Sequence, residues 1–185
     1  MIFNGEMVRA ILDGGKTQTR RPVKVPHIDR DAMCELSGNE LAGELSAGNY
    51  RNSPHGKPGD RIWVRETWAR YNIDQDSHDM AYRATPPEDW PEEGRWRPSI
   101  HMPRWASRLM LEITGVRVER LQAITLGDIC KEIGCGLYDF RPATYGFQVW
   151  EDLWKSIYGE ENWQANPWVW VIEFKVVPNV QDNPA

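Results

Sequence analysis

The sequence predicts an α+β fold, a small mixed β-barrel or bent sheet with flanking helices and long irregular insertions. Several short runs alternate apolar and polar residues as half-buried strands do, only a few stretches carry apolar residues at helical spacing, and no βαβ alternation is present. The 185 residues are enough for one large domain with a buried core. We expect a single domain over residues 1–177 and a flexible tail over 178–185.

The first element is a short helix that Asn4 can cap. Apolar residues at helical spacing follow, and Gly14 or Gly15 can take the left-handed conformation that ends a helix. The chain then turns into a short extended run that begins at Lys16. A regular strand would put Lys16 and Thr19 on opposite faces, so we expect the segment to begin in a turn.

Two irregular stretches interrupt the fold. Residues 22–57 are rich in Gly, Asn, Ser and Pro and predict a long loop or insertion. Residues 72–98 are acidic and proline-rich, with one short strand at 81–83. Between them, residues 57–60 predict a turn, and residues 61–66 alternate as a strand does.

The C-terminal half carries clearer signals. Residues 108–120 hold two alternating runs with a change of phase at Gly115, which predicts a bulge or bend. Thr125 and Asp128 open a helix that carries Glu132 and ends near Gly134 or Gly136. An amphipathic helix follows over about residues 144–158. The chain breaks at Asn166 and Pro167, and residues 168–177 form the most strand-like run.

Charge and cysteine content narrow the class of protein. The net charge of −5 and the pI of about 5.4 argue against nonspecific coating of nucleic acid, although basic residues gather between Lys16 and Arg30. The three cysteines have no paired spacing, so we expect reduced thiols. No leader or membrane-spanning stretch is evident. The sequence therefore predicts a soluble cytoplasmic protein that does not bind membranes.

Several enzyme classes lack their motifs. The chain has no Walker loop, no GxGxxG after a strand, no GxSxG elbow and no HExxH. The four histidines are scattered in predicted loops without metal-ligand spacing. We therefore predict no metal and no cofactor.

The run Gly14-Gly15-Lys16-Thr17-Gln18-Thr19-Arg20-Arg21 is the leading candidate for a site. A lysine held between a glycine pair and a strand is fixed by backbone on both sides, as a binding or catalytic residue needs to be. The simpler alternative is a helix, a turn and a strand with basic side chains on the surface.

The chain has ten tryptophans, and we expect most of them to lie in the core. Trp150 and Trp154 lie on one helical stripe, and Trp168 and Trp170 alternate as strand residues do. A second set lies among arginines, where a ring could stack on a base, although packing is the commoner role of tryptophan. That set comprises Trp63, Trp68, Trp96 and Trp105.

Several separated motifs together resemble the ASCH domain of the PUA-like superfamily. They are the Gly14–Arg21 run, Lys57-Pro58-Gly59-Asp60 before a strand, and the closing strand Trp170-Val171-Ile172-Glu173-Phe174. The runs 65–68, 98–108 and 166–170 are similar to a longer form found in phages and prophages. The resemblance covers nearly the whole chain and implies a PUA-like barrel with a cleft for RNA or modified nucleosides.

One branch of that family is similar to bacterial amidohydrolases that remove the acetyl group from N4-acetylcytidine. The resemblance implies catalytic roles for Lys16, Thr19 and Glu132. A lysine can take the proton of a threonine hydroxyl if desolvation or nearby cations lower its pKa, and a shielded carboxyl can protonate a departing amine. The alternative for Glu132 is a solvated helix residue. We assign substrate binding to Thr17, Arg20 and Arg21 next to Lys16 and Thr19. We also assign it to residues on and just after the predicted 61–66 strand: Arg61, Trp63, Arg65, Glu66 and Trp68.

Three functions follow from the sequence. The first is an amidohydrolase acting on N4-acylated cytidine. The second is a noncatalytic module that holds RNA or a modified base, with arginines on phosphates and tryptophans on bases. The third is a phage accessory protein that binds a host protein through its acidic insertion.

Overall fold

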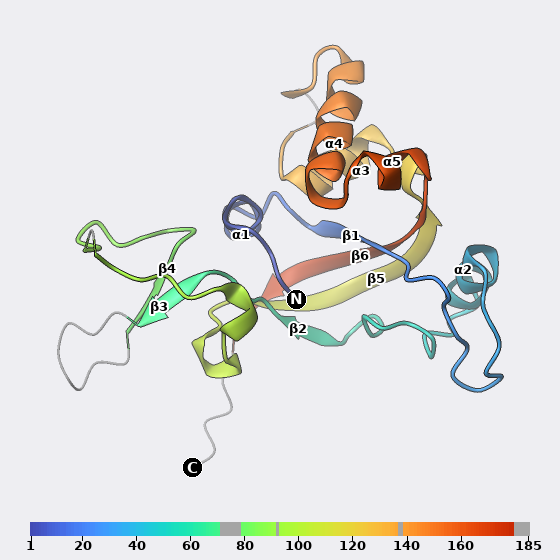
Figure 1. Cartoon of the computed structure of the whole chain (residues 1–185), viewed down its shortest axis with the longest axis horizontal. Coiled ribbons are helices and arrows are strands. Elements are labelled where there is room, and N and C mark those ends of the chain that lie inside the picture. The colour runs from blue at the N-terminus through green and yellow to red at the C-terminus, as the bar shows by residue number, and fades with distance from the viewer. Residues whose placement is uncertain (71–78, 92, 137–138, 180–185) are drawn as a thin grey trace.

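The computed structural model describes residues 1–70, 79–91, 93–136 and 139–179. A curled four-stranded antiparallel sheet forms its centre, in the strand order β1-β6-β5-β2 (Figure 1). The strands are β1 (Gln18–Pro22), β6 (Trp168–Val177), β5 (Met110–Arg120) and β2 (Arg61–Trp63). Helices flank this half-barrel, so the predicted α+β class is confirmed.

Residues 1–3 lie between the two edges of the curled sheet. Ile2 forms a parallel bridge with Arg65, and the Arg65 N–H donates to the Met1 carbonyl at 2.7 Å. On the other side, Arg21 Nη2 of β1 donates to the Ile2 carbonyl at 2.9 Å. The N-terminal segment therefore joins the β1 edge to the chain that follows β2.

Local signals in the sequence correctly predicted two of the helices. Asn4 caps α1 (Gly5–Leu12), with its side chain accepting from the Met7 N–H, and Gly14 beyond its end has a φ of +76°. Thr125 caps α3 (Leu126–Ile133), which ends at Gly134 in the left-handed region. These caps place the Lys16 segment between the C-terminal ends of the two helices.

The two long strands form the core. The register of β5 against β6 shifts between Ile113 and Gly115, which confirms the predicted bulge. In β6, Val169 and Val171 face one way, and Trp170 and Ile172 face the other. The first pair packs with residues of α3 and of α4 (Ala143–Tyr158), including the buried Trp150 and Trp154. Figure 1 shows α3, α4 and α5 (Glu160–Gln164) gathered on one side of the sheet.

The prediction of an irregular stretch over residues 22–57 was wrong in one part. A helix, α2 (Gly38–Ser46), packs against β5 through Leu41 and Leu45. Ser37 and Glu40 form a capping box that starts it. Gly38 lies so close to Trp168 that a Cβ there would be 2.1 Å from the ring. The small and polar residues that suggested a loop thus have structural roles: Ser37 and Glu40 cap the helix, and Gly38 allows close contact with Trp168.

The strand predicted over residues 61–66 is shorter, because β2 ends at Trp63. The chain continues into a two-stranded sheet of β3 (Trp68–Arg70) and β4 (Met80–Tyr82), which nearly matches the short strand predicted at 81–83. Three short 3₁₀ turns lie at Ser99–His101, Arg104–Ala106 and Leu121–Ala123. Parts of the predicted 72–98 insertion and of the tail, namely residues 72–78, 92 and 180–185, lie outside the described residues.

Candidate functional site

Backbone contacts fix the Lys16 segment at the end of β1. The Lys16 N–H donates to the Ala10 carbonyl of α1 at 2.9 Å, and the Thr17 N–H donates to the Lys131 carbonyl of α3 at 3.0 Å. The segment does begin in a turn, because β1 starts only at Gln18. Lys16 is therefore held between two helix ends, and its side chain points into the protein.

The Lys16 ammonium is almost fully buried, with 1% of the residue exposed. Its Nζ donates to the Gln18 carbonyl at 2.8 Å and to both the backbone carbonyl and the carboxylate of Glu132. The distance from Nζ to Glu132 Oε2 is 3.2 Å. Glu132 is 4% exposed. The solvated alternative for Glu132 is thus excluded.

Arg20 of β1 binds the same carboxylate. Its Nη1 donates to Glu132 Oε1 at 3.0 Å, and its Nη2 donates to Glu119 and lies 3.6 Å from Asp128. Each oxygen of Glu132 therefore faces a different cation. The structure brings together Lys16, Arg20 and Glu132, three residues that the sequence had singled out.

Further charges extend this cluster across the sheet. Arg117 of β5 bonds Glu119 at 3.1 Å and Glu173 of β6 at 2.6 Å, and it lies 3.4 Å from Asp128. The partners are on β5, β6 and α3, so the sequence alone gave no local signal for this pairing. Buried charges need such partners, because an unpaired one costs several kcal/mol.

The environment shifts the pKa values of Lys16 and Asp128 in this cluster. Burial lowers the pKa of Lys16, the Glu132 carboxylate opposes that shift, and the charges of Arg21 and Arg20 add to it. For Asp128, burial acts to raise the pKa, but the hydrogen bonds from Thr125 and the charges of Arg20 and Arg117 outweigh it, so the pKa is lowered. A lowered pKa makes the amine form of Lys16 easier to reach.

Thr19 lies on β1 opposite Ile172 and is 1% exposed. It lines a narrow cavity with Arg20, Arg21 and Glu132, closed on the far side by Trp150 and neighbouring residues of α4. The space open to water is about 10 Å³, which is roughly what one water molecule needs. Thr19 and Glu132 thus share a cavity that is closed to larger ligands in this structure.

The second group of predicted binding residues lies on β2, on β3 and on the chain between them. Arg61 is exposed. Arg65 covers the half-buried Trp63, with its guanidinium carbon 4.5 Å from the ring centroid. Trp68 is 2% exposed and packs edge-on against Trp105, so it offers no ring face to a base in this structure.

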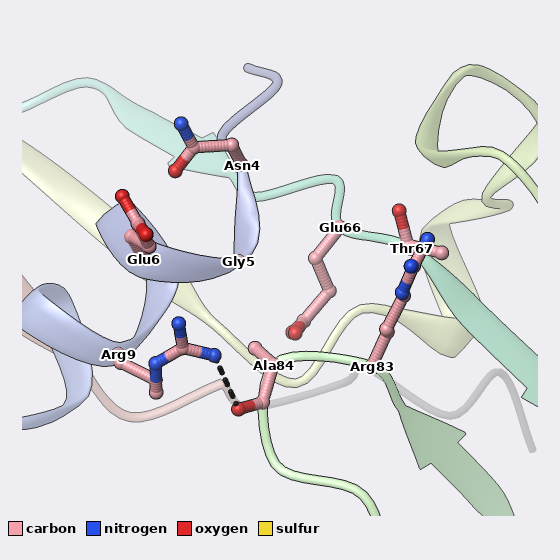
Figure 2. A pocket seen from close by; sticks show the side chains of 8 residues that line it. All are labelled: Asn4, Gly5, Glu6, Arg9, Glu66, Thr67, Arg83 and Ala84. Atoms are coloured by element: carbon pink, nitrogen blue, oxygen red, sulfur yellow. Dashed lines mark hydrogen bonds between the residues drawn. The ribbon is translucent and has the colours of Figure 1, made fainter. Parts of the chain in front are cut away.

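Glu66 occupies a pocket of about 540 Å³ between α1 and the end of β4. Figure 2 shows its side chain among those of Arg9, Thr67 and Arg83. Its carboxylate is held by Arg108 through two hydrogen bonds of 2.8 and 2.9 Å. The carboxylate therefore already has a cation, and Arg9 donates to the Ala84 carbonyl at 3.0 Å.

A pocket over the end of β1 was not foreseen from the sequence. It has a volume of about 580 Å³ and is lined by Arg21, Lys24, His27, His55 and Trp170, together with three prolines and Ile28. Only Arg21 of these had been assigned to a site. The histidines come from the irregular stretch, and the spacing along the chain gives no hint that they meet at Trp170.

The described residues contain no group of three or more potential metal ligands. Cys34, Cys130 and Cys135 are free thiols, as expected. Within residues 1–70, 79–91, 93–136 and 139–179, none of the helices combines the length and apolar character needed to cross a bilayer.

No protein-family model matches the chain, and neither a curated protein nor a solved structure does so. The resemblance to ASCH proteins therefore rests on the sequence motifs.

Proposed function

We propose that this protein recognises a modified nucleoside and is an amidohydrolase that removes the acyl group from N4-acylated cytidine. One observation carries the proposal: the buried carboxylate of Glu132 binds Lys16 and Arg20 and shares a cavity with Thr19. Thr19 and the shielded carboxyl thus line one cavity, and the carboxyl in turn binds an amine of lowered pKa. Acyl transfer uses these three types of group.

The chemistry divides into two steps. A neutral Lys16 amine takes the proton of the Thr19 hydroxyl, and Oγ1 attacks the acyl carbon. The bond from that carbon to N4 breaks as N4 takes a proton from Lys16 or from Glu132, and cytidine leaves. Water then hydrolyses the Thr19 ester and releases the acid. Glu132 either protonates the departing amine or positions the attacking group.

The cavity at Thr19 must widen before the substrate can enter, because its present space suits about one water molecule. Trp150 and Leu153 of α4 form part of the wall. A shift of this helix away from β1 would open the cavity without disturbing the bonds between Glu132 and β1.

The test follows release of cytidine from N4-acetylcytidine, free and within RNA, by chromatography. Thr19→Val keeps the side-chain shape and removes the hydroxyl, so we expect it to lower turnover about a thousandfold or more. Thr114→Val, at an exposed position of β5, is the matched control and should retain full turnover. Equal turnover in the two variants would exclude Thr19 as the nucleophile.

A noncatalytic binding module is the second candidate. It is favoured by the three oxygen acceptors around Lys16 Nζ, an arrangement that suits an ammonium group rather than an amine. In this case no variant or wild type releases cytidine. RNA affinity instead weakens with added salt. A plot of the logarithm of the binding constant against the logarithm of the salt concentration should have a slope of about −0.7 for each phosphate contact. Arg61→Ala would then make that slope less steep by roughly the contribution of one phosphate contact.

A further inference from the structure

The pocket over the end of β1 combines a flat apolar wall with a positive rim. Its volume of about 580 Å³ falls in the range of roughly 300–1,000 Å³ typical of small-molecule sites. The lining comes from the end of β1, the loop that follows it, residues 54–55 and β6. Such convergence of distant segments produces a concave surface with defined walls.

The wall consists of rings. His27 and His55 pack on Trp170, with ring centroids 5.7 and 5.8 Å from it. Trp170 itself is almost fully buried, so the imidazoles and the prolines provide most of the exposed ring surface. His27 is fixed by a contact of 3.0 Å from Nε2 to the Asn52 carbonyl. The wall therefore suits a flat, partly apolar group.

The charge of the rim is positive and is not neutralised by the protein. Arg21 and Lys24 line the pocket, and no acidic residue does so among the described lining residues. Arg21 bonds the Ile2 carbonyl and lies over the Phe3 ring, and neither of these is a negative group. No carboxylate of the described chain lies within ion-pair distance of Arg21 or Lys24. This excess stands out in a chain of net charge −5.

Positive charge at the rim affects the pKa of His55 in the wall. Burial lowers the pKa of His55 to about 4, and the charges of Arg21 and of the amino terminus add to the shift. His55 is therefore neutral at pH 7 and offers a flat ring with one donor and one acceptor. An anion bound beside it would offset the positive field.

We propose that this pocket binds the phosphate of a cytidine nucleotide on Arg21 and Lys24, with the flat part of the ligand against the imidazoles and prolines. Arg21 also lines the cavity at Thr19, so one residue of β1 borders both the pocket and the proposed reaction site. The identity of the base rests on the proposed function. The substrate is then a phosphorylated nucleoside rather than a free one.

The test is calorimetric titration of the protein with cytidine 5′-monophosphate and with cytidine, neither of which carries an acyl group to be removed. We expect the monophosphate to bind at least about tenfold more tightly, because its phosphate adds charge-assisted hydrogen bonds with Arg21 and Lys24. Lys24→Glu should weaken monophosphate binding about tenfold or more and leave cytidine binding unchanged. Lys24 is exposed, so this variant should fold.

Lys131→Glu is the matched control, since Lys131 is exposed and does not line the pocket. Equal binding of the two ligands, or equal losses in the two lysine variants, would overturn the proposal. Selective binding of the monophosphate without turnover of N4-acetylcytidine would support the nucleotide-binding pocket and exclude the proposed amidohydrolase activity. A cytidine oligonucleotide that shows the same loss in Lys24→Glu identifies RNA as the source of the phosphate. Binding of the monophosphate alone identifies the free nucleotide.

Discussion

The backbones of Gly15 and Gly134 are in direct contact. A Cβ on Gly15 would lie 2.6 Å from the Gly134 carbonyl oxygen, and a Cβ on Gly134 would lie 2.8 Å from the Ala10 side chain. The residue after Gly15 is Lys16, and Glu132 lies two positions before Gly134. The contact between the two glycines therefore sets the approach of Lys16 to its carboxylate partner.

Replacing either glycine by alanine should destabilise the fold. We expect Gly134→Ala to lower the free energy of unfolding by about 1–3 kcal/mol, because its φ of +87° is strained for alanine and the space is filled. Gly43→Ala in α2 is the control, since nothing lies within 4 Å of the added Cβ. It should stabilise the protein by about 0.5–1 kcal/mol. Urea denaturation measures both, and a neutral Gly134→Ala would contradict the close contact.

Removing the Glu132 carboxylate should leave two buried cations without their shared partner. We expect Glu132→Ala to lower the free energy of unfolding by about 3–5 kcal/mol. Glu160→Ala removes a solvent-exposed carboxylate that pairs with Lys155, and it should lower the free energy of unfolding far less. Similar losses in the two variants, measured by denaturation at pH 7, would show that the buried cluster contributes no more to the free energy of unfolding than a surface ion pair does.

The His55 pKa gives the free energy of unfolding a pH dependence. Its ordinary value is 6.5, and the folded value is about 4. Between these limits the unfolded state binds more protons, so the free energy of unfolding falls as the pH drops from 6.5 towards 4. Denaturation at pH 7 and pH 5 should show a smaller fall for His55→Gln than for wild type. Parallel losses in the two proteins would argue against the lowered pKa.

The thiols of Cys34 and Cys135 should react at very different rates. Cys34 is exposed, whereas burial and the neighbouring Cys130 raise the pKa of Cys135 to about 12. The thiolate is the reactive form, so Cys135 should be alkylated far more slowly than Cys34 at pH 8. Mass spectrometry after timed iodoacetamide treatment measures this order. Comparable rates in the folded protein, with Cys34→Ser as a check on assignment, would contradict it.

Local signals predicted the elements that begin and end at caps or glycines. Asn4 and Thr125 marked the starts of α1 and α3, and Gly115 marked the bulge in β5. Helix α2 was missed because its glycines and polar residues dominate its composition. The spacing from Ser37 to Glu40, followed by Leu41 and Leu45, was the signal that could have revealed it.

The candidate site was predictable only in part. Lys16 and Arg20 lie in one short segment, and the family resemblance suggested Glu132 as their partner. Glu119, Glu173 and Arg117 could not be predicted, because strand pairing brings them to the cluster from β5 and β6. The pocket at Trp170 could not be predicted either, because its walls come from segments far apart in the chain.

Strand β6 lies between β1 and β5, and this position has a consequence for folding. Gln18 pairs with Glu173, and Met110 pairs with Val177. Both neighbouring strands are synthesised before the strand that joins them, and such distant pairings slow folding. The four-stranded sheet can form only after the ribosome has released Val177. Until then β1 lacks its sheet partner, β5 can pair only with β2, and the charge cluster is incomplete.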